Sequence, residues 1–302
     1  METISEHELQ KEIRTPRPLG IVASLFLTVG ILLLQLFFFS VVILVGKLAG
    51  VAGTALMMGM MLLGSLIWVA CAYYLQRVLR LPPFVLSISV RGLSIPVMLL
   101  LIPFAFLMQV AGGSLDSIIL TFYPSHKSSL DQFQNMVLNF PLSLIFLLLL
   151  TIVVAPLSEE LYFRGLLFRG MRVKGLHVFV AALATGLIFA LVHLQIVGMV
   201  TLTLVGLSCA YLSHKSRSLF YSVWLHGVYN AMVMGFSFTV FFVKAPEFYT
   251  FGDPLPSTGV VPDPLWANLL RAILFGGAAM ALLFYTGSKV VLQEGSAPEE
   301  KS

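Results

Sequence analysis

Long apolar runs, separated by shorter polar stretches, dominate the chain. Eight runs come close to or exceed the roughly 20 apolar residues that a helix needs to cross the hydrocarbon core of a bilayer. Backbone groups in lipid must find hydrogen bonds within their own segment, so we expect every run to be helical. The predicted helices cover residues 19–45, 51–75, 94–112, 141–158, 178–196, 198–213, 218–243 and 265–291.

The polar stretches between these runs divide into tails, short connections and two longer connections. Residues 114–140 mix aromatic residues with Ser and Asp, which favours an interfacial or re-entrant stretch, and the Pro-rich residues 246–264 favour a turn-filled outer loop. Residues 1–17 and 292–302 are expected to be solvated tails. No internal repeat is visible, so we predict one membrane domain over residues 1–302.

Composition supports lipid as the solvent. The chain is 58% hydrophobic and only 11% charged, against about 25% charged residues in a soluble domain. The net charge of +4 comes from basic residues that are scattered between the apolar runs. Such a distribution is typical of the connections of a membrane protein and does not favour nucleic-acid binding. Cys71 and Cys209 lie in apolar segments without ligand-like spacing, so they are predicted to be packing residues.

Lysine and arginine residues alternate along the successive connections. The N-terminal tail and the second, fourth and sixth connections are rich in them, whereas the other connections carry one or none. Because basic residues concentrate on the cytoplasmic side of a membrane protein, this pattern predicts a multi-pass protein with both termini cytoplasmic. Oligomeric state is not predicted.

Ionisable residues inside predicted spans mark candidate functional sites, because charge is costly in lipid. Glu160 and Arg164 are four residues apart, share a helix face and can neutralise each other. Glu159 lies about 100° round the same helix, and a less compensated carboxylate in low dielectric suits a general base. If the helix continues to residue 172, Pro156 kinks it and Glu159 lies roughly 20 Å below its basic end; the alternative is a wet helix end.

Two further polar pairs occur in other predicted spans. Phe189 and His193 share one helix face, as do His226 and Asn230, because each pair is separated by four residues. The imidazole and the amide of the second pair could donate to one developing oxyanion. The alternative for each residue is an interhelical hydrogen bond that serves packing alone.

Together, Glu-Glu-x-x-x-Arg, Phe-x-x-x-His and His-x-x-x-Asn on successive spans resemble the type II CAAX endopeptidase family, which is also called the Abi family and includes bacteriocin-processing membrane proteases. The resemblance covers residues 141–235 and predicts an all-α membrane protein with about eight helices around a polar cavity. It implies an intramembrane endopeptidase that cleaves near the cytoplasmic leaflet, such as one that removes the C-terminal tripeptide after a prenylated cysteine. The implied partners are a peptide or prenylated protein C-terminus and the lipid bilayer.

The resemblance also implies a role for each residue. Glu159 would be the general base with His193 orienting the water, His226 and Asn230 would form the oxyanion hole, and Glu160, Arg164 and Phe189 would support the site. No metal or other cofactor is implied. Two histidines and a glutamate are also a possible zinc set, but no His-Glu-x-x-His motif occurs. A non-catalytic scaffold or immunity protein and a proton-coupled transporter are the alternative functions.

Overall fold

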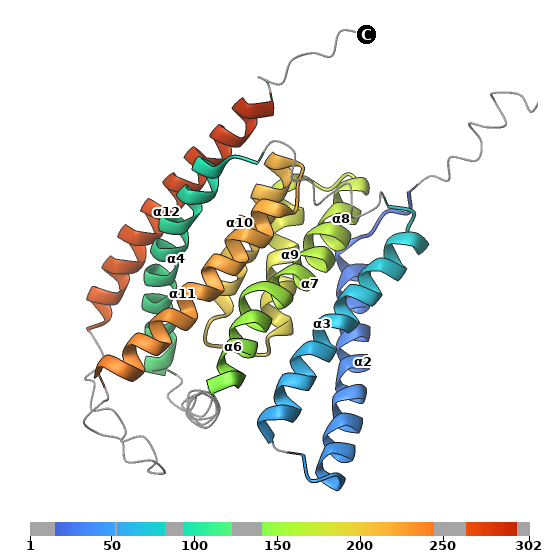
Figure 1. Cartoon of the computed structure of the whole chain (residues 1–302). Coiled ribbons are helices and arrows are strands. Elements are labelled where there is room, and N and C mark those ends of the chain that lie inside the picture. The colour runs from blue at the N-terminus through green and yellow to red at the C-terminus, as the bar shows by residue number, and fades with distance from the viewer. Residues whose placement is uncertain (1–15, 52, 82–92, 123–140, 245–263, 295–302) are drawn as a thin grey trace, which may run out of the picture.

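The computed structural model describes residues 16–51, 53–81, 93–122, 141–244 and 264–294. These residues are almost entirely helical and contain no strand. Every one of the eight predicted runs coincides with a helix (Figure 1). The first three helices are α2 (Ile21–Leu48), α3 (Gly53–Val78) and α4 (Ile95–Phe122), and the last four are α9 (Val178–Val192), α10 (Met199–Ser216), α11 (Phe220–Lys244) and α12 (Leu265–Glu294).

The fourth helical rod is continuous from residue 141 to residue 173 but changes its winding. It consists of α6 (Pro141–Leu149), the π-helical segment η2 (Leu150–Val154), α7 (Ala155–Glu160), the π-helical segment η3 (Leu161–Phe168) and α8 (Arg169–Val173). This is the long helix expected from the sequence rather than a wet helix end. The two carboxylates Glu159 and Glu160 therefore lie between two π-helical segments.

The helix boundaries differ from prediction at several places. The third helix does not end at residue 112 but continues to Phe122, so residues 114–122 belong to this helix and not to a connection. The fifth helix ends at Val192 instead of residue 196, because Leu194 and Gly198 adopt left-handed backbone conformations that interrupt it. Helix α12 continues to Glu294, three residues into the predicted tail. The rest of residues 114–140 and the predicted outer loop lie almost wholly outside the described residues.

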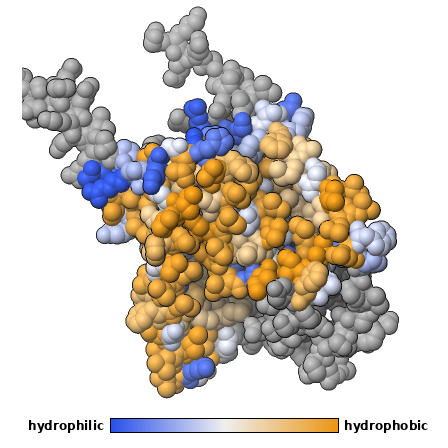
Figure 2. Space-filling view, turned by 180° about the vertical axis from the view of Figure 1, so that it is seen from behind, coloured by the Kyte–Doolittle hydropathy of each residue, from blue (hydrophilic) through white to orange (hydrophobic). Residues whose placement is uncertain are grey.

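Five helical segments are long and apolar enough to cross a membrane: 21–48, 55–78, 95–119, 144–173 and 265–290. Helix α9 is apolar but has only 15 residues. Large hydrophobic side chains lie exposed along the outer faces of these helices, and Figure 2 shows an apolar surface over most of one face of the molecule, with hydrophilic residues gathered mainly at its upper end. An apolar surface of this extent fits lipid contact, and the chain is a multi-pass membrane protein.

The basic residues that alternate along the sequence meet at one end of the bundle. The backbone N–H of Arg17 donates to the carbonyl of Leu79 at the end of α3, and that of Leu19 donates to Gly170 in α8. The C-terminal end of α12 points the same way (Figure 1). We call this the basic end of the bundle. Its cytoplasmic placement remains a prediction.

Two cores position the motif-bearing helices. The first lies between η3, α9 and α3 and includes Phe163, Leu166 and Phe189. The second joins α4, α10, α11 and α12, where α12 packs along α4. Helices α9 and α10 also pack side by side, and they come so close that a Cβ at Gly186 would lie 2.8 Å from the carbonyl oxygen of Thr203. This close packing brings residues of α9 and α10 against the motif helix.

Candidate active site

Pro156 shapes the helix just before the two glutamates. In η2 a backbone N–H donates to the carbonyl five residues earlier in the chain, as the N–H of Ala155 does to the carbonyl of Leu150. The next carbonyl, that of Thr151, would need an N–H from Pro156, which has none. The side-chain amide of Asn230 on α11 donates to this Thr151 oxygen instead, at 2.9 Å. Asn230 thus satisfies a backbone carbonyl that proline leaves without a donor.

Glycine lets α11 approach the same point. A Cβ at Gly227 would lie 2.6 Å from the carbonyl oxygen of Ile152, a backbone atom that cannot swing aside. Ile152 precedes Pro156 by four residues, so its carbonyl also lacks the ordinary α-helical donor. The motif that carries His226 and Asn230 therefore packs directly on the stretch of carbonyls before the proline.

Glu160 and Arg164 form the buried ion pair predicted from their spacing. Nη1 of Arg164 lies 2.6 Å from Oε1 of Glu160, and both side chains have no exposed surface. Nη2 of Arg164 donates to the carbonyl of Gly206 on α10 at 2.8 Å. The arginine also lies 5.0 Å from the ring centroid of Phe189. Arg164 therefore joins the motif helix to α9 and α10.

His226 reaches both glutamates. Its Nδ1 is 3.0 Å from Oε1 of Glu160, and its Nε2 is 3.7 Å from Oε2 of Glu159. An ionised carboxylate can only accept hydrogen bonds, so Nδ1 carries the hydrogen that Glu160 accepts. The Glu160 contact was not foreseen, because sequence spacing reports neighbours on one helix and not contacts between helices. It gives Glu160 a direct link to a predicted site residue.

Glu159 is the less compensated carboxylate, as its position on the helix suggested. Its Oε2 is buried and has no hydrogen-bond partner among the described residues, as is also true of Oε2 of Glu160. The Glu159 side chain has no short ion pair like that of Glu160 with Arg164, and it keeps 18% of its surface exposed. An unpaired carboxylate oxygen in an apolar region is costly. This oxygen is therefore free to take a hydrogen bond, or a proton, from a molecule that enters the site.

Phe189 connects the two histidines. Its ring packs edge-on against His193 at 4.8 Å and against His226 at 5.4 Å between ring centroids. The two imidazoles thus flank one side chain, although their residues lie at different distances along their helices. His193 is the C-cap of α9 rather than a residue deep within it, and its Nδ1 lies 2.7 Å from the carbonyl of Phe189. That carbonyl must accept, so Nε2 of neutral His193 is left as an acceptor.

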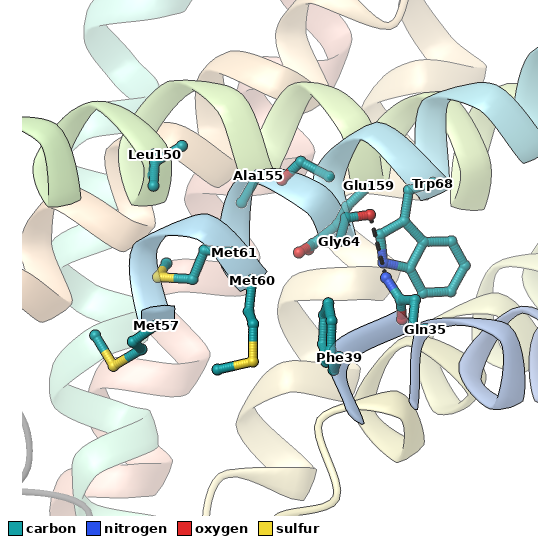
Figure 3. A pocket seen from close by; sticks show the side chains of 11 residues that line it. Gln35, Phe39, Met57, Met60, Met61, Gly64, Trp68, Leu150, Ala155 and Glu159 are labelled. Atoms are coloured by element: carbon teal, nitrogen blue, oxygen red, sulfur yellow. Dashed lines mark hydrogen bonds between the residues drawn. The ribbon is translucent and has the colours of Figure 1, made fainter. Parts of the chain in front are cut away.

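A pocket of about 340 Å³ opens beside Glu159, between α2, α3 and the motif helix. In Figure 3, Glu159, Gly64, Trp68 and Gln35 gather at one end of the pocket, and three methionines of α3 lie toward the other. Most lining side chains are apolar, so this pocket differs from the polar cavity expected from the sequence. Its polar lining side chains are Gln35, Ser65, Trp68 and Glu159. The amide of Gln35 is committed to the Gly64 carbonyl at 3.1 Å.

Asp116 is a residue near the site that sequence reasoning missed. It fell in a predicted loop, whereas the structure places it in α4. Its Oδ1 accepts a hydrogen bond of 2.9 Å from the N–H of Gly198 and one of 3.4 Å from the hydroxyl of Thr201. Gly198 is the N-cap of α10, at the end of the turn that follows His193, and Thr201 lies in the first turn of α10. The signal that could have found it is a lone carboxylate close to the end of a long apolar run.

No group of three or more His, Cys, Asp or Glu residues in the described ranges is arranged to hold a metal ion. Cys71 and Cys209 are free thiols in packed surroundings. In the described part of the chain, no hydrogen bond or ion pair joins His193 to Glu159. The structure therefore brings His226 within 3.0 Å of Glu160 and 3.7 Å of Glu159. His193 contacts the ring of Phe189, which His226 also contacts.

Comparison with known proteins bears on the motif-bearing part of the chain. The model of the type II CAAX prenyl endopeptidase Rce1-like family matches residues 141–232. No curated protein and no solved structure matches the chain. The matched residues contain all three sequence motifs and the whole cluster around Phe189, so the resemblance found in the sequence is confirmed. The chain carries a type II CAAX prenyl endopeptidase Rce1-like domain, a domain of membrane proteases.

Proposed function

We propose that this protein is an intramembrane endopeptidase in which Glu159 activates the water that attacks the scissile peptide bond. The observation that carries the proposal is the unpartnered Oε2 of Glu159, which is buried 3.7 Å from Nε2 of His226 on a side chain that lines the apolar pocket. A general base must lie within reach of the proton it abstracts and have room for substrate beside it. Glu159 meets both conditions.

In the proposed reaction a water donates one hydrogen bond to Glu159 and a second to Nε2 of His193. Glu159 takes the proton as the water oxygen bonds to the scissile carbonyl carbon, and the carbonyl oxygen becomes negatively charged. The proton then passes from Glu159 to the peptide nitrogen, the carbon–nitrogen bond breaks, and a carboxylic acid and an amine leave. Water is the only co-reactant, so no metal is needed for the balance.

The oxyanion would be stabilised by His226 and Asn230. Nδ1–H of His226 already donates to Glu160, so to donate to the oxyanion His226 must carry a second hydrogen on Nε2, the nitrogen on the side of Glu159. Asn230 uses one amide hydrogen on the Thr151 carbonyl and keeps a second. Each such donor contributes about 3 kcal/mol to transition-state binding in other hydrolases.

The apolar pocket favours a substrate that carries a lipid. Met57, Met60 and Met61 line it, and methionine adapts its shape to flexible apolar ligands. A volume of about 340 Å³ is within the range of small-molecule sites. We therefore propose a prenylated C-terminal peptide as substrate, with the lipid in this pocket and the scissile bond at Glu159.

The test is cleavage of a farnesylated CAAX peptide by the full chain in detergent, followed by mass spectrometry of the released tripeptide. We expect release by the wild-type protein, much slower release from the same peptide without its prenyl group, and no effect of a strong chelator. Release blocked by chelator and restored by zinc would replace the glutamate mechanism with a metal one. A wild-type protein that cleaves neither peptide would favour the scaffold or transporter reading.

A further inference from the structure

A second pocket lies at the basic end of the bundle, away from the apolar pocket. It has a volume of about 260 Å³ and is formed by η3, α8 and the segment where α10 ends and α11 begins. Four arginines line it, Arg164, Arg169, Arg172 and Arg217, and no lining residue is acidic. Arg164 is paired with Glu160, but the other three arginines bring like charges to one cavity, where they repel one another. An occupant of opposite charge would relieve that repulsion.

Arg164 lines this pocket, and its side chain has unused hydrogen-bonding capacity. Only 2% of its surface is exposed. Two of its nitrogens are committed to Glu160 and to the Gly206 carbonyl, but its Nε has no hydrogen-bond partner among the described residues. A buried N–H without an acceptor is costly, so an acceptor supplied by a ligand would stabilise the folded protein.

His214 also lines this pocket and lies close to several positive charges. Burial lowers the pKa of His214, and the nearby charges of Arg172, Lys215 and Arg217 lower the pKa further. A lower pKa favours the neutral imidazole, which adds no charge to the pocket. Its remaining N–H is a further hydrogen-bond donor for a ligand. Ser213 and Ser218 also line the pocket and bring hydroxyl groups to the same cavity.

We propose that this pocket binds a phosphate group, supplied either by the headgroup of an anionic phospholipid or by free phosphate. Guanidinium groups bind phosphate through paired N–H···O bonds, which makes arginine the preferred residue for such sites. The cavity has several times the roughly 30 Å³ that one water molecule occupies in the liquid, so a phosphate fits. The pocket also lies at the basic end, where an anionic headgroup would meet the bundle.

Phosphate binding would reach the catalytic cluster through Arg164. This arginine lines the phosphate pocket and also pairs with Glu160, which contacts His226. A phosphate bound to Arg164 would hold this arginine in addition to its ion pair with Glu160. Through that ion pair it would also restrain Glu160. The binding itself does not depend on the proposed proteolysis, because none of its four arginines has a proposed chemical role.

The experiment measures thermal unfolding of the full chain in neutral detergent, with three additions: inorganic phosphate, a short-chain phosphatidic acid, and the matching phosphatidylcholine. We expect phosphatidic acid, but not phosphatidylcholine, to raise the melting temperature. An equal effect of inorganic phosphate at the same concentration identifies free phosphate as a sufficient ligand, and an effect of phosphatidic acid alone identifies the lipid headgroup. No effect of either anion would overturn the proposal.

Variants locate the site. Arg172→Gln combined with Arg217→Gln removes two cations of the pocket, and we expect the apparent Kd for the anion to rise by at least about tenfold. Arg77→Gln removes a cation near the end of α3 outside the pocket and should leave the Kd unchanged. If the double variant folds poorly, Arg217→Gln alone, at an exposed position, provides the same comparison. An unchanged Kd in the pocket variants would assign the binding to another surface.

Discussion

Nδ1 of His226 lies 3.0 Å from Oε1 of Glu160, across the contact between α11 and α7. The same carboxylate oxygen holds Arg164 at 2.6 Å. Glu160 therefore fixes the imidazole and the guanidinium together, and Nε2 of His226 is directed to the side of Glu159. Two adjacent glutamates thus have different surroundings. Oε1 of Glu160 is bound to both Arg164 and His226, whereas the contact of Glu159 with His226 is 3.7 Å long. Oε2 of each glutamate has no hydrogen-bond partner among the described residues.

This difference predicts unequal effects on stability for two equivalent substitutions. Glu160→Gln leaves the buried charge of Arg164 without its partner, which costs about 3–5 kcal/mol when a buried ion pair is broken from one side. Glu159→Gln removes a charge that has no hydrogen-bonded partner, so the melting temperature should hardly change. Thermal unfolding of both variants in one detergent tests this. Equal destabilisation by the two substitutions would contradict the assignment of separate roles.

Asn230 and Pro156 should be coupled. Asn230→Ala leaves the Thr151 carbonyl without a donor, at a cost of about 1–3 kcal/mol. Pro156→Ala restores a backbone N–H that can serve the carbonyls before it, so Asn230→Ala should cost less in that background. A double-mutant cycle of unfolding free energies measures the coupling. Strictly additive effects would mean that Asn230 does not compensate for the proline.

The close contact of α9 and α10 predicts a glycine requirement at one position. In Gly186→Ala the new methyl group would meet the Thr203 carbonyl, which is backbone and cannot yield without moving a helix. We expect destabilisation by about 1–3 kcal/mol, as in other overpacked cores. Gly113→Ala on α4 is the control, because nothing lies within 4 Å of its new Cβ. That control should be neutral or stabilising by up to about 1 kcal/mol.

Asp116 is expected to position His193 through the turn that it holds. Asp116→Ala removes the acceptor for the Gly198 N–H and the Thr201 hydroxyl, so the turn after His193 loses its anchor. We expect a lower kcat with little change in KM for the prenylated peptide. Asp116→Asn keeps an acceptor oxygen and should restore most of the rate. A rate that is unchanged in Asp116→Ala would remove this residue from the account.

Much of the fold could be predicted from the sequence because lipid imposes strict rules on apolar runs. Eight runs gave eight helices, and the spacing of Glu160 and Arg164 predicted their ion pair, because both features depend on residues close in sequence. The alternation of basic residues likewise predicted that they gather at one end of the bundle.

The remaining features depend on contacts between helices. The link from Glu160 to His226 could not be predicted from spacing within one helix, and the commitment of Asn230 to the Thr151 carbonyl follows from a π-helical turn that no residue pattern announced. The position of His193 at a helix end depends on left-handed conformations at Leu194 and Gly198, and the apolar run continues past both. Apolar residues that line a pocket also look the same in sequence as residues that face lipid.

The most direct test of the central claim is the initial rate at which Glu159→Gln cleaves a farnesylated CAAX peptide, relative to wild type and to Arg77→Gln. Removing a positioned general base typically costs about 10²–10⁴-fold in rate. We predict a loss of at least that size in Glu159→Gln, with an unchanged melting temperature and a wild-type rate in Arg77→Gln. Cleavage by folded Glu159→Gln within a few-fold of the wild-type rate would contradict the role assigned to Glu159.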